Sequence, residues 1–165
     1  MKKVRQGLMG AALGIALMGC GVQPTGVIGA GEPASGLTRG ARLYFASAGG
    51  LRGVPVLDRE IKSLDAVVKL LLEGPPPAEQ ADRLTSFVQI PGFSVTGTGA
   101  HVTVHLYGAY PETGRDQGTG QLVCTLARTQ SVLEPKVRTD DVKVTLRPSE
   151  GAVLGPYRCA EFLNG

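Results

Sequence analysis

His101 and His105 are the only histidines of the 165-residue chain, and imidazole groups serve both metal binding and acid–base chemistry. On a helix, two histidines four residues apart share a face and can bind one metal ion. The surrounding HVTVHL segment alternates polar and apolar residues instead, which predicts a strand. On a strand, this spacing separates the two Cα atoms by about 13 Å. We therefore expect both histidines on a polar strand face, without a shared metal.

Phosphate binding is the chemistry that Gly118-Thr119-Gly120 suggests, because glycine-rich loops before helices cradle phosphates. The third glycine and the directly preceding strand of such a loop are missing. We interpret Thr119 as the N-cap of a helix instead. The sequence also lacks a P-loop and a G-x-S-x-G motif. We assign no catalytic residue, cofactor or metal ligand, and an enzyme site assembled from distant residues is kept as an alternative.

The first 19 residues have the pattern of a secretory signal. Three basic residues precede an apolar run at 8–19, which is shorter than the about 20 residues of a membrane-spanning helix. The following Leu17-Met18-Gly19-Cys20 resembles the lipobox of bacterial lipoproteins. In that family the cysteine receives a diacylglyceryl group, the signal is cut before it, and the new N-terminus can carry a fatty acid such as palmitate. We predict lipid attachment at Cys20; the alternative is an ordinary signal with an incidental cysteine.

Cys124 and Cys159 are the two remaining cysteines. Export would place this pair in a compartment where disulfides form and persist. A disulfide between them would stabilise the fold by about 3–4 kcal/mol in the chain-entropy model. Two buried thiols or a metal pair are the alternatives, although neither cysteine has a histidine or second cysteine at ligand spacing. We predict the disulfide.

Removal of the signal changes the charge of the chain. Three of the 17 basic residues precede Cys20 and all 14 acidic residues follow it, so the mature chain is formally neutral. Because nucleic-acid-binding proteins usually carry a basic excess, we expect no nucleic acid partner. Residues 20–40, rich in Gly, Pro, Ser and Thr, are expected to form a lipidated flexible tether. Its 20 residues after Cys20 would span about 25 Å as a random coil.

The residues from 41 onward carry alternating strand and helix patterns. Strands are expected at 43–46, 53–57 and 142–146, with a hairpin at 94–106. Helices are expected at 64–73, between Ser63 and Gly74-Pro75, and at 121–133. Residues 148–165 are expected to be a tail that the disulfide holds. The predicted core-facing residues are Leu64, Val67, Val68, Leu71, Leu72, Val102, Val104, Leu106, Leu122, Val123, Leu126 and Ala127.

The segments LYFA, GVPVLDRE, LDAVVKLLLEGPPPAEQADRLTS, HVTVHL, QLVCTLARTQSV and VKVTLR follow one another between residues 41 and 147. In this order they resemble the GerMN domain, a family linked with sporulation and spore germination that also occurs singly in surface lipoproteins. The resemblance implies an α+β fold, with two helices packed on one face of a mixed, mainly antiparallel sheet in a single small domain. It also implies a protein-interaction role, because related domains build ring assemblies.

The predicted function is that of a membrane-anchored, extracytoplasmic, non-catalytic binding domain linked to sporulation, germination or envelope assembly. A small-ligand-binding lipoprotein or an extracytoplasmic enzyme is the alternative. Pro55 cannot donate to a β-ladder, so its strand should lie at a sheet edge and offer unpaired backbone groups to an envelope protein. The predicted partner surface is this edge with the adjacent GPPPAEQ loop, namely Val54, Pro55, Val56, Leu57 and Asp58.

Overall fold

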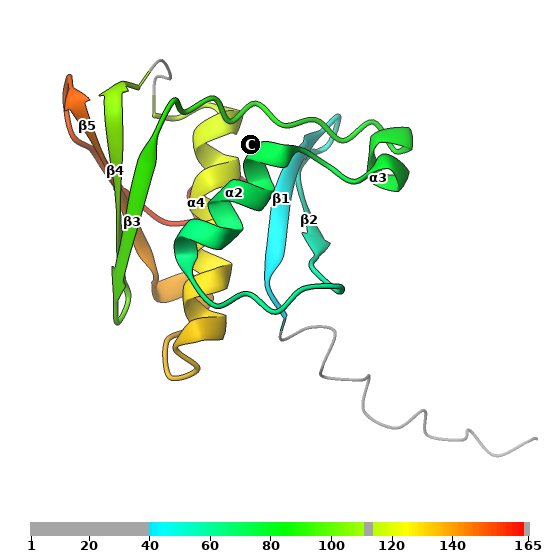
Figure 1. Cartoon of the computed structure of the whole chain (residues 1–165), viewed down its shortest axis with the longest axis horizontal. Coiled ribbons are helices and arrows are strands. Elements are labelled where there is room, and N and C mark those ends of the chain that lie inside the picture. Colours follow the sequence, from blue (N-terminus) through cyan, green and yellow to red (C-terminus); the bar gives the residue numbers. More distant parts are fainter. Residues whose placement is uncertain (1–39, 111–113, 164–165) are drawn as a thin grey trace, which may run out of the picture. The chain divides into compact units, whose positions relative to one another are not determined.

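The computed structural model describes residues 40–110 and 114–163 (Figure 1). Helix and strand content are comparable, which confirms the predicted α+β class. The elements in chain order are β1 (Arg42–Ser47), β2 (Gly50–Pro55), α2 (Leu64–Glu73), α3 (Pro77–Ala81), β3 (Phe93–Thr98), β4 (His101–Ala109), α4 (Gln117–Leu133), the 3-10 helix η1 (Thr139–Asp141), β5 (Lys143–Glu150), β6 (Leu154–Tyr157) and α5 (Ala160–Leu163).

The strands form two separate sheets. The larger has the order β3-β4-β5-β6, with antiparallel pairs on both sides of a parallel β4–β5 pair. It is therefore mixed and mainly antiparallel, as predicted. β1 and β2 form an antiparallel hairpin of their own. The hairpin stays separate because side chains of α4 and a single bridge to Thr85 occupy the second edge of β1.

Helices α2 and α4 lie between the larger sheet and the β1–β2 hairpin (Figure 1). They pack against each other; α2 also contacts β3 and β1, and α4 contacts strands of both sheets. Val102, Val104 and Leu106 of β4 are at most 2% exposed and belong to one core cluster with Leu122 and Leu126 of α4. The helices thus cover one face of the larger sheet, as predicted.

Helix α2 has the predicted bounds. The Ser63 hydroxyl accepts a hydrogen bond from the backbone N–H of Ala66 at 3.2 Å and caps the helix. The helix ends at Gly74, which has a φ of 85°, a conformation that glycine adopts easily. Of the five predicted apolar residues, Leu72 is only partly buried and the other four are buried. The apolar spacing therefore identified the core face correctly.

Helix α4 begins at Gln117, four residues before the predicted start. The Thr119 cap was wrong: the N-cap is Asp116, whose carboxylate accepts a hydrogen bond from the Thr119 N–H at 2.8 Å. Thr119 lies inside the first turn, where it is buried. A carboxylate at this position also interacts favourably with the positive end of the helix dipole. The predicted inward residues Leu122, Val123, Leu126 and Ala127 are all fully buried.

The segment from residue 148 onward is more ordered than predicted. Strand β5 continues to Glu150, β6 pairs with it, and α5 follows. The sequence did not predict this hairpin, because glycine and proline are depleted in strands and the segment contains Pro148, Gly151 and Pro156. Residues 148–157 thus complete the larger sheet instead of forming a tail beside it.

Candidate partner-binding groove

The structure joins Cys124 and Cys159 in a disulfide, with Cα atoms 4.5 Å apart. This confirms the predicted pair and fastens the segment before α5 to α4. The proposed signal, lipid attachment site and tether lie outside the described residues, so the Cys20 hypothesis stays a prediction. Among the described residues, no helix combines the length and hydropathy that crossing a membrane requires.

Both histidines lie on β4 with their side chains exposed, which confirms the predicted strand. They share the outer face of the larger sheet, opposite the face that α2 and α4 cover, because Val102 and Val104 alternate with them and are buried. In the described part of the chain, no three His, Cys, Asp or Glu residues are grouped closely enough to hold a metal ion.

The Gly118-Thr119-Gly120 segment serves close packing. A Cβ atom at Gly118 would lie 3.0 Å from the Phe87 carbonyl oxygen, and one at Gly120 would lie 2.9 Å from the Phe162 side chain. All three residues are buried inside α4, where no loop is open to a phosphate. The glycines therefore bring the 82–92 segment and α5 against the helix.

The strand with Pro55 is an edge strand, as predicted, but it covers Gly50–Pro55 and not 53–57. Its partner β1 begins at Arg42, directly opposite Pro55. One further backbone bond joins the Val56 N–H to the Ala41 carbonyl at 3.0 Å. Leu57 and Asp58 have no strand to pair with in the described residues and turn away from the ladder.

The predicted partner surface borders a groove of about 450 Å³. One wall is the end of β2 and the residues that follow it, 54–59, and the other is the end of α2 with the proline-rich loop, 74–77. The structure therefore brings together the edge segment and the loop that the sequence analysis singled out. We call this feature the Pro-rich groove; its lining also includes Leu43, Leu70, Glu73 and Gln80.

The floor and rim of the Pro-rich groove differ in chemistry. Leu43 and Val54 are buried core residues at its base, whereas Leu57 at its rim is 67% exposed. An ion pair between Arg59 and Glu73 joins the two walls at 3.8 Å, and both side chains are more than 60% exposed. Because such exposed pairs contribute at most about 1 kcal/mol, this one opens easily. The groove thus combines apolar residues with polar ones, and a weak ion pair joins its two walls.

The loop wall is held more firmly than the rim. The Gln80 amide donates to the Pro75 carbonyl at 2.7 Å and closes the loop onto α3. Arg52 of β2 reaches Asp82 at 3.2 Å and Glu79 at 3.8 Å, which adds partly exposed polar contacts between the hairpin and the α3 region. Consecutive prolines at 75–77 further restrict the backbone. The groove therefore has a preformed shape.

The outer edge of β2 carries unpaired backbone groups. Directly opposite residues in an antiparallel ladder alternate between bonded and non-bonded pairs. Ala41 and Val56 are a bonded pair, so the next pair, Arg42 and Pro55, is non-bonded. The alternation continues with a bonded pair and then a second non-bonded pair, which contains Gly53. Gly53 therefore turns its N–H and C=O outward, and the missing N–H of Pro55 removes nothing from the ladder. Within the described residues, no other strand pairs with this edge.

The opposite edge, on β1, is closed by residues that the sequence analysis did not single out. The Tyr44 N–H donates to the Thr125 hydroxyl at 2.9 Å, and its carbonyl accepts from the Gln121 amide at 3.2 Å. Gln121 also donates to Thr85 and accepts from the Phe87 N–H at 2.7 Å. The sequence did contain a signal for this contact, namely the polar residues Gln121 and Thr125, four residues apart on a helix with an apolar face. Buried polar groups need hydrogen-bond partners, so such a pair indicates polar groups packed against the helix.

The chain matches no protein-family model, no curated protein and no solved structure. What the groove can do follows from its own geometry. An extended segment laid along β2 can pair with the outward N–H and C=O of Gly53, and its apolar side chains can contact Leu57 and the prolines. The arrangement fits recognition of a peptide segment.

Proposed function

We propose that this chain is a lipid-anchored, extracytoplasmic protein whose non-catalytic domain binds an extended segment of an envelope protein in the Pro-rich groove. The lipobox-like sequence ending at Cys20 supports the anchor. The resemblance to the GerMN domain supports a protein-interaction role, and extends the proposal to sporulation, germination or envelope assembly. No catalytic residue, metal or cofactor is part of it.

One observation carries the proposal: a groove with apolar residues at its base and rim adjoins an unpaired strand edge. Main-chain bonds to an added strand supply affinity, while pockets for its alternate side chains supply selectivity. The groove offers Leu57 and a proline loop for apolar side chains, and the edge offers Gly53 for the backbone. The partner that fits is a segment in extended conformation with apolar residues at every second position.

The proposed anchor strengthens the binding without adding contacts. A tether of 20 residues would keep the domain within about 25 Å of the lipid on average. Confinement near a membrane raises the effective concentration of any partner in the same membrane. A groove with modest intrinsic affinity would then suffice for a stable complex at the cell surface.

The test is to crosslink the anchored protein in the native membranes of the producing cell and to recover its bound partners. The wild-type chain is compared with the variants Leu57→Asp and Val153→Asp. Both substitutions place a carboxylate at an exposed apolar side chain, 67% exposed at Leu57 and 54% at Val153. Val153 lies between β5 and β6, away from the groove lining. We expect Leu57→Asp to abolish recovery of the partner and Val153→Asp to leave it unchanged.

Equal recovery with Leu57→Asp and wild type would remove the groove from the proposal. A separate fractionation tests the anchor: Cys20→Ala should leave the precursor uncut or release the domain from membranes. Normal cleavage and membrane retention of this variant would contradict lipid attachment. Turnover of a substrate that disappears on mutation of one buried polar residue would overturn the non-catalytic class.

A further inference from the structure

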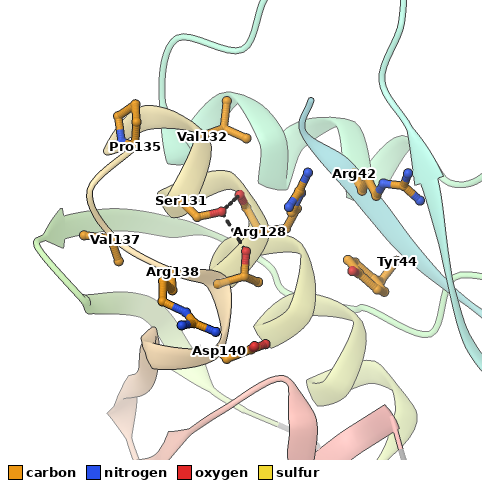
Figure 2. A pocket seen from close by; sticks show the side chains of 10 residues that line it. Arg42, Tyr44, Arg128, Ser131, Val132, Pro135, Val137, Arg138 and Asp140 are labelled. Atoms are coloured by element: carbon orange, nitrogen blue, oxygen red, sulfur yellow. Dashed lines mark hydrogen bonds between the residues drawn. The ribbon is translucent and has the colours of Figure 1, made fainter. Parts of the chain in front are cut away.

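A second and larger hollow, of about 1000 Å³, lies beside β1 and the C-terminal half of α4. Arg42 and Tyr44 border it from β1, Arg128 and Ser131 from α4, and Arg138 and Asp140 from the segment after α4 (Figure 2). We call it the Arg pocket. Its residues come from two parts of the chain that are far apart in the sequence, β1 and the stretch from Arg128 to Asp140.

The lining of the Arg pocket is strongly cationic. Three arginines, Arg42, Arg128 and Arg138, and a single carboxylate residue, Asp140, line it. Among the described residues, neither Arg128 nor Arg138 forms an ion pair with a carboxylate. The lining is thus rich in arginine, in a mature chain that is formally neutral. Clefts lined by one sign of charge attract ions of the other sign.

Arg128 is held in place without full compensation. Its Nε donates to the Gly40 carbonyl at 3.1 Å, and this bond fixes the guanidinium against the start of β1. Its Nη2 atom is buried and has no hydrogen-bond partner among the described residues. A buried cationic group that lacks partners is unfavourable. A negative charge in the pocket would offset this through charge attraction, without direct contact with Nη2.

The other walls of the Arg pocket are fixed and partly apolar. The Ser131 hydroxyl donates to the Arg128 carbonyl and pairs with the Thr139 hydroxyl, each at 2.8 Å, as the dashed lines in Figure 2 show. These bonds hold η1 against α4. Val132, Pro135 and Val137 complete the lining on this side. A ligand of this pocket therefore combines an anionic group with a small part that tolerates apolar surroundings.

We propose that the Arg pocket binds the phosphate group of a small organic phosphate. Guanidinium groups form bidentate, charge-assisted hydrogen bonds with phosphate and carboxylate oxygens. Arg42 lies on β1, Arg128 on α4 and Arg138 just before η1, and a phosphate offers more oxygens to several such donors than the two of a carboxylate. The glycerol of a phospholipid headgroup would fit against Val132 and Val137.

The assignment of the phosphate to a lipid headgroup depends on the proposed lipid anchor, whereas phosphate binding by the pocket does not. Gly40, which Arg128 contacts, is the residue at which the described domain joins the proposed tether. With Cys20 in the membrane, the Arg pocket would open beside the segment that leads to the lipid surface. Headgroup phosphates are then the nearest candidates, and free phosphate is the other source of the same chemistry.

Calorimetric titration of the mature chain in a nonionic detergent tests the pocket. The probes are inorganic phosphate, glycerophosphoglycerol as the anionic headgroup and glycerophosphocholine as the zwitterionic one, at constant ionic strength. Arg138→Gln removes one pocket charge from an exposed position. Arg147→Gln removes the same charge from an exposed position on β5, opposite His105 and outside the pocket.

We expect saturable binding that Arg138→Gln weakens by about tenfold, the loss of one charge-assisted contact, and that Arg147→Gln leaves unchanged. Tighter binding of glycerophosphoglycerol than of inorganic phosphate supports the headgroup, and the reverse order supports free phosphate in the same pocket. No saturable binding, or equal binding by Arg138→Gln and wild type, overturns the proposal. Membrane fractionation of Cys20→Ala tests the anchor separately, so the two failures are distinguishable.

Discussion

The Pro-rich groove and the Arg pocket use the two faces of the same short hairpin. Leu43 and Val54, directly opposite each other in the ladder, line the groove. Arg42 and Tyr44, which precede and follow Leu43, line the pocket. Side chains alternate between the faces of a strand, so adjacent residues serve different surfaces. One surface combines apolar and polar residues, and the other is rich in arginine.

The two surfaces also differ in the parts of the fold that shape them. The groove gains its shape from the backbone, through consecutive prolines, the end of α2 and the edge of β2. The pocket gains its character from three long side chains, one of which, that of Arg128, is held by a bond to the Gly40 carbonyl. Substitutions should therefore act on the pocket through charge, and on the groove through shape and apolar contact.

The largest loss of stability is expected in the hydrophobic core between the two sheets. Leu71 of α2 is fully buried, so Leu71→Ala should lower the free energy of unfolding by about 2–5 kcal/mol through lost burial and a cavity. Urea denaturation followed by circular dichroism measures it. Lys69→Ala, at an exposed position of the same helix, is the control. A near-neutral Leu71→Ala would contradict the assignment of the core face.

The next largest effect concerns the disulfide, which fastens α4, a wall of the Arg pocket, to the C-terminal segment. Replacement of Cys124 and Cys159 by Ala should lower the free energy of unfolding by about 3–4 kcal/mol, mainly by releasing a constraint on the unfolded chain. Denaturation with and without reductant measures this. Reductant should destabilise the wild type and leave the double variant unchanged; the same response in both would argue against the bond in solution.

A smaller effect should be confined to the groove side. Ser63→Ala removes the N-cap of α2, whose opposite end borders the Pro-rich groove, and should lower the free energy of unfolding by about 1 kcal/mol. Thermal and urea denaturation measure it. Ser63→Asp, which retains a capping oxygen, should restore most of the loss. If Ser63→Ala and Ser63→Asp are equally stable, the hydroxyl has no capping role.

The smallest effect on stability tests the independence of the two surfaces. Leu57→Asp changes an exposed rim residue and should alter the free energy of unfolding by less than about 0.5 kcal/mol. Phosphate titration of this variant should match the wild type, because Leu57 lies outside the Arg pocket. A loss of phosphate binding would show that the two faces of the hairpin are coupled.

Local signals in the sequence were sufficient for α2 and for the β3–β4 hairpin. Ser63, the apolar spacing and Gly74-Pro75 define a helix without reference to the rest of the chain. The start of α4 was different. Gly118 and Gly120 are poor helix formers, and the reason for both is close packing against Phe87 and Phe162, which lie far away in the sequence. Tertiary contacts overrode local propensity there.

The two candidate sites differ in the same way. The position of the Pro-rich groove could be predicted, because Pro55 indicates an edge strand and the proline run indicates a rigid loop. Only α2 and a short connection separate these two features in the sequence. The Arg pocket could not, because Arg42 lies far in the sequence from Arg128 and Arg138. An isolated arginine in a sequence looks like any solvated surface residue. Its role emerges only when the fold collects several around one hollow.

The register of the hairpin has a mechanical consequence. Arg42 and Pro55 stand directly opposite each other, so the chain enters the domain beside the end of the strand that borders the groove. A pull between the proposed tether and a partner held in the groove would act on this one pair of strand ends. The bonds of Gly40 to Arg128 and of Ala41 to Val56 would carry the load first, and the ladder beyond them would open one bond at a time. The larger sheet lies outside this line of force and would stay folded while the hairpin yields.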